Sequence, residues 1–494
     1  MNSLSPIHII ITVGIYFLVL YLISYWTSRK TTDTTFFNGD KSSPWLLVAF
    51  GMIGATLSGV TFISIPGVVG GGGLNMAFSY MQMVFGYLVG YFVIATVLMP
   101  IYYKYNLLTI YGFLEKRLGF YSYKTAAGFF ILSRLIGASF RLFLVSMVLH
   151  LFITGPMGVP FWCIVVITLA LIWVYTFKGG IKTIVWTDTI QTTFMLLAVI
   201  LTITYILSDL GISVSEVPAT LDEFGLSKMF FFENGWNDPN NFFKQFISGA
   251  FIALVMTGLD QDMMQKNLTC KSLPEAQKNM YLFSVILVFA KLMFLTLGAL
   301  LFIFAMKNGI EVPERTDQLY PIIALDHLPP LVGIVFIIGI IAAAYSSADS
   351  ALTSLTTSFC VDFLNFEKSD DEKQKRKTRL WVHFGFTIII FSIILIFNSL
   401  DGSAVINKLF EWSGYTYGPI LGLFSFAILT KLDIKDQYVI PLAIITPVLA
   451  YIINTNSEAW FGGLKLGFMI IVLTGLLCFI GLLLISKSKK KSLE

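Results

Sequence analysis

The sequence predicts an all-α protein that crosses a membrane many times. Of its 494 residues, 56% are hydrophobic and 13% are charged, whereas a soluble domain has roughly 25% charged residues. The mean hydropathy is +0.79. Apolar stretches recur between His8 and Ile485, and each has the ~20 residues that a helix needs to cross the hydrocarbon core of a bilayer. We therefore expect one polytopic transmembrane domain over residues 1–494, surrounded by lipid.

Thirteen stretches are apolar and long enough to be transmembrane helices, and this odd number places the two termini on opposite sides of the membrane. The predicted spans are 8–26, 46–72, 76–102, 123–153, 160–177, 183–207, 242–260, 279–306, 331–360, 380–399, 408–430, 437–454 and 463–485. The long loops 208–241 and 307–330 show no sign of a separate folded domain.

The distribution of basic residues predicts the orientation of these spans. Most of the 33 Lys and Arg residues fall on one side, including the run from Lys368 to Arg379, the tail from Lys487 to Lys491, and Lys266 in the loop after the seventh span. Because Lys and Arg collect in cytoplasmic loops, this side faces the cytoplasm. We expect a multi-pass protein of the plasma membrane, a bacterial inner membrane, with its N-terminus outside and its C-terminus in the cytoplasm.

The composition also argues against several functional classes. The net charge is only +4 and the basic residues are scattered, so nucleic acid is not an expected partner. Cys163, Cys270, Cys360 and Cys478 are far apart and fit neither a disulfide framework nor a metal site. The sequence has no HExxH motif and no P-loop. We therefore expect a protein that is not an enzyme, and no obligatory protein partner is evident.

The second span, GMIGATLSGVTFISIPGVVGGGG over residues 51–73, is unusually rich in small and helix-breaking residues. We expect it to be interrupted near its middle. An interruption frees backbone carbonyl groups, which are tolerated at membrane depth only in a protein interior or a cavity, where they often bind a cation. The alternative is that the small residues only allow close helix packing.

The ninth span carries a cluster of polar residues, in GIIAAAYSSADSALTSLTTS over residues 339–358. Ser346, Ser350 and Thr353 share one helical face by their spacing. The carboxylate of Asp349 costs a few kcal/mol within a membrane unless it faces the interior of the bundle and finds a cation or a donor. Either an ion site or hydrogen bonds to a neighbouring helix would satisfy these groups.

Asp188, Arg134, Arg141 and Lys291 are further ionisable residues within predicted spans. Asp188 is early in the sixth span, where it either helps to bind Na⁺ or H⁺ through hard oxygen ligands or lies at a helix interface. Arg134 and Arg141 are seven residues apart and so share a face of the fourth span. Together with Lys291 in the eighth span, they either meet an anionic substrate or form internal ion pairs.

Five strings resemble the sodium/solute symporter family: TLSGVTFISIPG, LTIYGFLEKRLG, GGIKTIVWTDTIQ, LDQDMMQKNLTCKSLPEAQK and AAAYSSADSALTSL. The resemblance runs nearly end to end and is nearest to the sialic acid and sugar members. It implies a LeuT-type inverted repeat of five plus five helices, with an extra N-terminal helix at 8–26, repeats at 46–207 and 242–430, and two C-terminal helices over 437–485. It also implies symport, in which the inward Na⁺ gradient drives uptake of a small polar solute such as a sialic acid, a sugar or a carboxylate.

The family's ligands carry over residue by residue. The main Na⁺ site would use the carbonyl groups of Gly54, Leu57 and Ala343 and the hydroxyl groups of Ser346 and Ser347. A second ion site, found in some members, would use Asp188, Ser346, Asp349 and Ser350. Asp349 replaces the serine of those members, and a proton on its carboxylate is the alternative to a second Na⁺. Substrate contacts would fall on Thr56, Ser58, Thr61, Phe78 and Gln82, with Arg134 as the candidate for an anionic group.

By simple counting, the family's carboxylate-binding arginine aligns with Gly137 rather than with Arg134. A proton-coupled carrier, a channel and a solute sensor on the same fold are the alternative functions.

Overall fold

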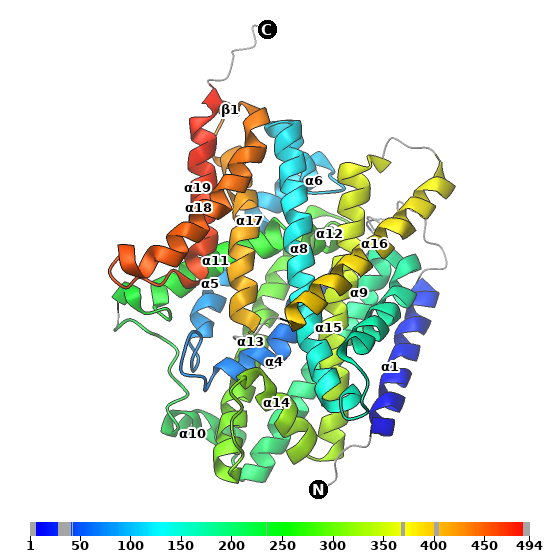
Figure 1. Cartoon of the computed structure of the whole chain (residues 1–494), viewed down its shortest axis with the longest axis vertical. Helices are drawn as coiled ribbons and strands as arrows, with labels where there is room; N and C mark the ends of the chain where they lie inside the picture. The colour runs from blue at the N-terminus through cyan, green and yellow to red at the C-terminus, as the bar shows by residue number, and fades with distance from the viewer. Residues whose placement is uncertain are drawn as a thin grey trace.

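The computed structural model describes residues 6–27, 41, 43–233, 235–366, 371–399 and 405–487. These residues form a helical bundle in which α1 (Pro6–Thr27) and the pair α18–α19 (Val439–Trp460 and Ile470–Leu484) lie on opposite flanks (Figure 1). A short antiparallel pair, β1 (Asp433–Ile434) and β2 (Ser486–Lys487), joins the two ends of that C-terminal hairpin.

The first half of the bundle follows α1. Its helices are α3 (Trp45–Thr56), α4 (Gly59–Val68), α5 (Tyr80–Val93), α6 (Met99–Tyr105), α7 (Gly112–Arg117), α8 (Phe120–Leu149) and α9 (Phe161–Leu210). A π-helical turn, Ile94–Leu98, joins α5 to α6, and another, His150–Thr154, extends α8. The short α10 (Val217–Glu223) lies in the loop that leads to the second half.

The second half contains α11 (Phe242–Ala253), α12 (Gln261–Asn267), α13 (Leu273–Asn308), α14 (Leu319–Ile322), α15 (Pro330–Ser358), α16 (Glu372–Asn398) and α17 (Val405–Leu429). π-Helical turns follow α11 (Leu254–Gly258), α14 (Ile323–His327) and α15 (Phe359–Phe363). Every predicted span overlaps one of the helices described.

By length and composition, the described helices provide nine candidate membrane spans, or eleven if each of two bent helix pairs is one span. This does not confirm the predicted count of thirteen. The predicted spans 160–177 and 183–207 both fall within α9, which runs for 50 residues without a loop. Within α9, Phe161–Val174 is a shorter apolar stretch and Thr183–Leu210 is a full span.

The centre of the bundle is formed by α4 and α15. All ten residues of α4 are buried, and so is α15 from Gly339 to Ser358. Glycines allow neighbouring helices to approach closely, as in α5 and α11, where a Cβ atom on Gly86 or Gly249 would overlap the backbone of the opposite helix. Close packing also surrounds α4, since a Cβ atom on Gly298 of α13 would lie 2.6 Å from the carbonyl oxygen of Pro66, and it holds the helix that follows the break.

Candidate functional site

The predicted break in the second span is confirmed. Helices α3 and α4 meet at an angle of 57°, with Leu57 and Ser58 between them. The N–H of Leu57 donates to the carbonyl of Ile53 at 2.7 Å, and Ser58 is extended with ψ of 177°. The helix end leaves the following carbonyl groups without intrahelical donors, so this backbone can accept a cation or a polar ligand.

The hydroxyl groups of α15 face this break. The Ser347 hydroxyl donates to the carbonyl of Ala55 at 3.4 Å. A Cβ atom on Gly54 would lie 3.1 Å from Ser346 Oγ, which places that hydroxyl directly beside the end of α3. Leu57, at the break, and Ala343, one turn before Ser347 on α15, are both buried. The structure thus brings the two predicted halves of the main Na⁺ site together.

Asp188, on α9, lies next to the same hydroxyl. Its Oδ1 accepts a hydrogen bond from Ser346 Oγ at 2.7 Å, and its Oδ2 lies 2.7 Å from Lys266 Nζ. Both side chains of this ion pair are fully buried. The assignment of Lys266 to a cytoplasmic loop is therefore wrong: α12 folds back into the bundle and carries the lysine to Asp188.

The other predicted second-site residues also contact protein groups. Ser350 Oγ donates to Asp262, and Asp262 forms an ion pair with Arg134. Asp349 is fully buried, and its Oδ1 accepts the Ser350 N–H at 2.5 Å. The four predicted ligands are thus in one region of α9 and α15, within a network that two basic side chains enter.

A second break, between the α11 segment and α12, was not predicted from the sequence. The two parts meet at 67°. Asp260 caps α12 by accepting the N–H groups of Asp262 and Met263 at 2.9 and 3.3 Å, and the carbonyl of Gly258 accepts the Tyr102 hydroxyl at 2.8 Å. The signal was the string TGLDQD, a glycine followed by a helix-capping aspartate.

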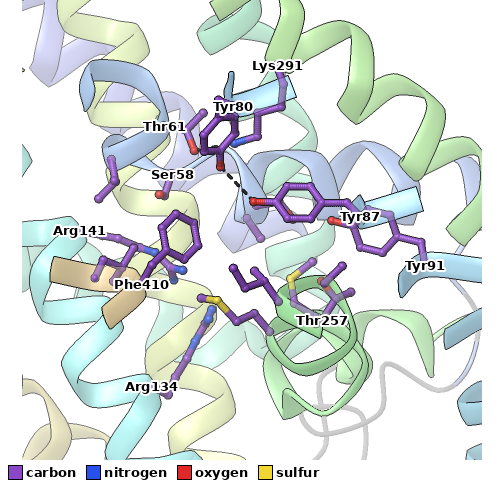
Figure 2. Close-up of a pocket in the computed structure, with 18 residues that line it drawn as sticks. Ser58, Thr61, Tyr80, Tyr87, Tyr91, Arg134, Arg141, Thr257, Lys291 and Phe410 are labelled. Carbon is purple, nitrogen blue, oxygen red and sulfur yellow. Dashed lines mark hydrogen bonds between the residues drawn. The ribbon is translucent and has the colours of Figure 1, made fainter. Parts of the chain in front are cut away.

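A pocket opens beside the first break (Figure 2). Its polar lining includes Thr56, Ser58 and Thr61 from the broken span and Tyr80, Tyr87 and Tyr91 from α5, and apolar groups from α11 and α17 complete it. The hydroxyl groups of Tyr80 and Tyr87 are 3.1 Å apart. The Thr56 hydroxyl is buried without a hydrogen-bond partner in the described part of the chain, so it is available to a ligand.

Three basic side chains reach this pocket from different sides (Figure 2). Arg134 is paired with Asp262 and lies 3.8 Å from Asp260. Arg141 is buried, and its Nε and Nη1 groups have no hydrogen-bond partner among the described residues. Lys291 Nζ donates to Thr61 Oγ1 at 3.1 Å. Within the described residues, no carboxylate lies within 4.0 Å of Arg141 or Lys291.

The site thus combines a broken helix, a hydroxyl-bearing helix and a basic pocket. Comparison with known proteins identifies the family of the chain. Residues 36–432 match the profile of the Sodium:solute symporter family. The chain belongs to that family.

Among its relatives, this symporter is 26% identical to the sodium/sialic acid symporter NanT of Aliivibrio fischeri over 490 residues, which cover 95% of this chain and 90% of the relative. It is 25% identical to the sodium/sialic acid symporter SiaT of Proteus mirabilis, over 91% of this chain and 90% of that one. The sodium/glucose cotransporter of Vibrio parahaemolyticus is 26% identical, over 87% and 82% of the two chains.

The symporter's structure is similar to that of a Na⁺-coupled sialic acid symporter in a substrate-bound, outward-open state, with a TM-score of 0.79 and 20% identity over 97% of this chain and 99% of that chain. Mhp1, a nucleobase-cation-symport-1 family transporter, gives a TM-score of 0.53 with 11% identity over 90% and 92% of the two chains. The predicted LeuT-type fold is thereby confirmed, while the exact repeat boundaries at 46–207 and 242–430 stay a prediction.

Two predicted substrate residues of this symporter lie outside the pocket lining. Gln82 donates to the carbonyl groups of Ser79 and Asn240 at 3.2 and 2.8 Å and accepts the Phe231 N–H at 3.0 Å. Phe78 is buried, and its N–H donates to the carbonyl of Lys228 at 3.0 Å. Both residues fasten the loop that precedes α11, whereas Thr56, Ser58, Thr61 and Arg134 do line the pocket.

Proposed function

We propose that this symporter couples the inward movement of Na⁺ to uptake of a small polar organic anion, and that the solute binds in the pocket beside the α3–α4 break. The observation that supports the anionic class is the pair of buried basic side chains, Arg141 and Lys291, without a carboxylate partner among the described residues. A buried charge is unfavourable unless it is paired. A carboxylate on the solute would provide that partner.

For Na⁺, the proposed ligands are the carbonyl oxygens of Gly54, Leu57 and Ala343 and the hydroxyl oxygens of Ser346 and Ser347. Carbonyl and hydroxyl oxygens suit a small hard cation. The hydrogen bond of 3.4 Å between Ser347 Oγ and the carbonyl of Ala55 is long, so a cation between α3 and α15 would replace a weak contact with stronger ones.

Coupling follows from the position of these groups along the chain. Thr56 and Ser58 line the solute pocket, and Leu57 between them belongs to the proposed Na⁺ site. Binding of Na⁺ to α3 and α15 would fix the backbone that presents the two hydroxyl groups to the solute. Linkage requires the reverse effect as well, because the solute must strengthen Na⁺ binding by the same factor.

The names of three relatives support the anionic class. Both bacterial relatives named above as sialic acid symporters transport an acid, and the sodium-coupled monocarboxylate transporter 1 of mouse is 23% identical to this chain. A sialic acid bears one carboxylate and several hydroxyl groups, which would match Arg141, Lys291 and the hydroxyl groups of Ser58 and Thr61. We propose the same orientation as the basic loops predict, with the N-terminus outside the cell.

The membrane potential then contributes to uptake. An inside-negative potential provides about 2.3 kcal/mol per elementary charge for each 100 mV, and the Na⁺ gradient adds to this. The protein would alternate between outward-open and inward-open states around the pocket.

Uptake by proteoliposomes tests the proposal. The full chain is reconstituted, and uptake of radiolabelled N-acetylneuraminic acid, lactate and glucose is measured with an inward gradient of Na⁺ or of choline. We expect uptake of an acid in Na⁺ only. Vesicles loaded with the unlabelled acid should also accumulate the labelled acid transiently by counterflow, which a channel does not give. Uptake of glucose without either acid would refute the anionic class, and equal uptake of all solutes in Na⁺ and choline would refute the coupling.

Two variants connect the result to the pocket. Arg141→Gln and Lys291→Met are expected to reduce uptake of the acid by at least about tenfold, because each removes one partner of a buried charge pair. Lys307→Met is the matched control, since Lys307 is an exposed residue on the same helix as Lys291. Full activity of both pocket variants would place the solute elsewhere.

A further inference from the structure

Lys266 lies where the resemblance to the symporter family implies a second ion site. Its Nζ is 2.7 Å from Asp188 Oδ2, and neither side chain is exposed to solvent. Asp188 was a predicted ligand of the second ion together with Ser346, Asp349 and Ser350. The other oxygen of Asp188 accepts the Ser346 hydroxyl at 2.7 Å. Both oxygens of this carboxylate therefore already have a partner within the protein.

The position of Lys266 is fixed by the helix that carries it. The side chain of Gln261, at the start of α12, accepts the Ile110 N–H at 2.9 Å and donates to the carbonyl of Leu108 at 3.0 Å. At the other end, the carbonyl of Lys266 accepts the Thr269 hydroxyl at 2.7 Å, and the carbonyl of Asn267 accepts the Tyr103 hydroxyl at 3.1 Å. The ammonium group is thus held next to Asp188 by a well-anchored helix.

A second basic side chain of the protein, Arg134, lies near the remaining part of this site. Ser350 donates to Asp262, and Asp262 is paired with Arg134. A Na⁺ ion at Asp188 would have to displace the Lys266 ammonium into a fully buried environment without its counterion, which is strongly unfavourable. By contrast, the main site at Gly54, Leu57 and Ser347 is reached by no basic side chain among the ion pairs and hydrogen bonds of the described residues.

We propose that the Lys266 ammonium acts as a built-in cation that permanently fills the second ion position, so that this symporter carries one Na⁺ per cycle. An ammonium group and Na⁺ carry the same single charge, and both bind carboxylate and hydroxyl oxygens. The lysine therefore balances Asp188 in every state of the cycle without being transported. The inference rests on the proposed Na⁺-coupled function and specifies its stoichiometry.

Binding of ²²Na⁺ to the purified full-length protein tests this inference without knowledge of the solute. At saturating Na⁺, we expect one bound ion per wild-type protein and two per Lys266→Met protein, because that variant exposes Asp188 to Na⁺. Lys266→Arg keeps the charge and should bind one ion. The double variant Lys266→Met/Asp188→Asn removes both charges and should also bind one ion.

The outcomes separate the two proposals. Two ions on the wild-type protein, or a single ion on folded Lys266→Met protein, would overturn the built-in cation while leaving Na⁺ coupling intact. No bound Na⁺ on the wild-type protein would refute the proposed function, and the inference with it. If Lys266→Met does not fold, as judged by size-exclusion chromatography, the ion count of the wild-type protein and of Lys266→Arg still decides, because both must equal one.

Discussion

Gly54 and Thr192 lie so close that a Cβ atom on the glycine would overlap the threonine hydroxyl. That hydroxyl lies 2.6 and 3.0 Å from the carbonyl oxygens of Asp188 and Phe50, between which its one hydrogen is shared, so it cannot move away without loss of hydrogen bonding. The same added Cβ would lie 3.1 Å from Ser346 Oγ and from the Asp188 carbonyl. The end of α3 is therefore held against α9 and α15 at the proposed Na⁺ site, and only glycine fits there.

The first prediction follows from this contact. Gly54→Ala should lower the stability of the protein by about 1–3 kcal/mol through overpacking and should raise the Na⁺ concentration needed for half-maximal uptake. The measurements are thermal unfolding in detergent and uptake as a function of Na⁺. Gly14→Ala is the control, since an added Cβ at that helical glycine meets nothing within 4 Å. If the overlap is the cause, Gly54→Ala/Thr192→Ala should recover part of the loss.

The second prediction separates the two arginines of α8. Arg134→Gln should destabilise the protein by about 3–5 kcal/mol, because it leaves buried Asp262 without its counterion. Arg141→Gln should leave the unfolding temperature close to that of the wild-type protein, because Arg141 has no carboxylate partner within 4.0 Å among the described residues. Thermal unfolding of both variants is the test. Equal destabilisation would show that Arg141 also holds helices together.

The third prediction concerns the serines of α15. Ser347→Ala should raise the Na⁺ concentration for half-maximal uptake by about tenfold, since one hydrogen bond or ligand contact to a charged group is worth about 1.5–3 kcal/mol. Ser354→Ala is the matched control: Ser354 is buried on the same helix, and among the described residues its hydroxyl donates to the local carbonyl of Ala351 at 3.0 Å. If the Na⁺ dependence of uptake is unchanged in Ser347→Ala, the Ser347 hydroxyl is not a ligand of the ion.

The sequence predicted the parts of this arrangement that depend on local pattern. The break at Leu57 and Ser58 follows from small residues next to a proline-containing segment, and the polar face of α15 follows from spacing along one helix. Both signals lie within a single span. Hydropathy also located each of the nine described helices that are candidate membrane spans, because the need to satisfy backbone groups in lipid leaves few alternatives to a helix.

The parts that depend on tertiary contacts could not be predicted in this way. The sequence predicts Lys266 in a loop because its segment is short and polar, and nothing local shows that α12 is buried against Asp188. Arg134 and Arg141 are equivalent by spacing, and only the position of Asp262 on another helix distinguishes them. The residue type of Gln82 suits a polyhydroxylated solute and a loop anchor equally well, so its hydrogen-bond partners decide between the two.

The fourth prediction tests whether Gln82 anchors the loop before α11 or contacts the solute. Gln82 bonds to the backbone of Phe231 and Asn240 at 3.0 and 2.8 Å, and it is fully buried. Gln82→Ala should therefore lower stability by about 1–3 kcal/mol, because it leaves buried backbone groups unpaired, and should make the loop before α11 more accessible to protease. The solute concentration for half-maximal uptake should change less than in Arg141→Gln. A tenfold or larger rise in that concentration, with unchanged stability and proteolysis, would instead show that Gln82 contacts the solute, because only the apparent affinity for the solute would then have changed.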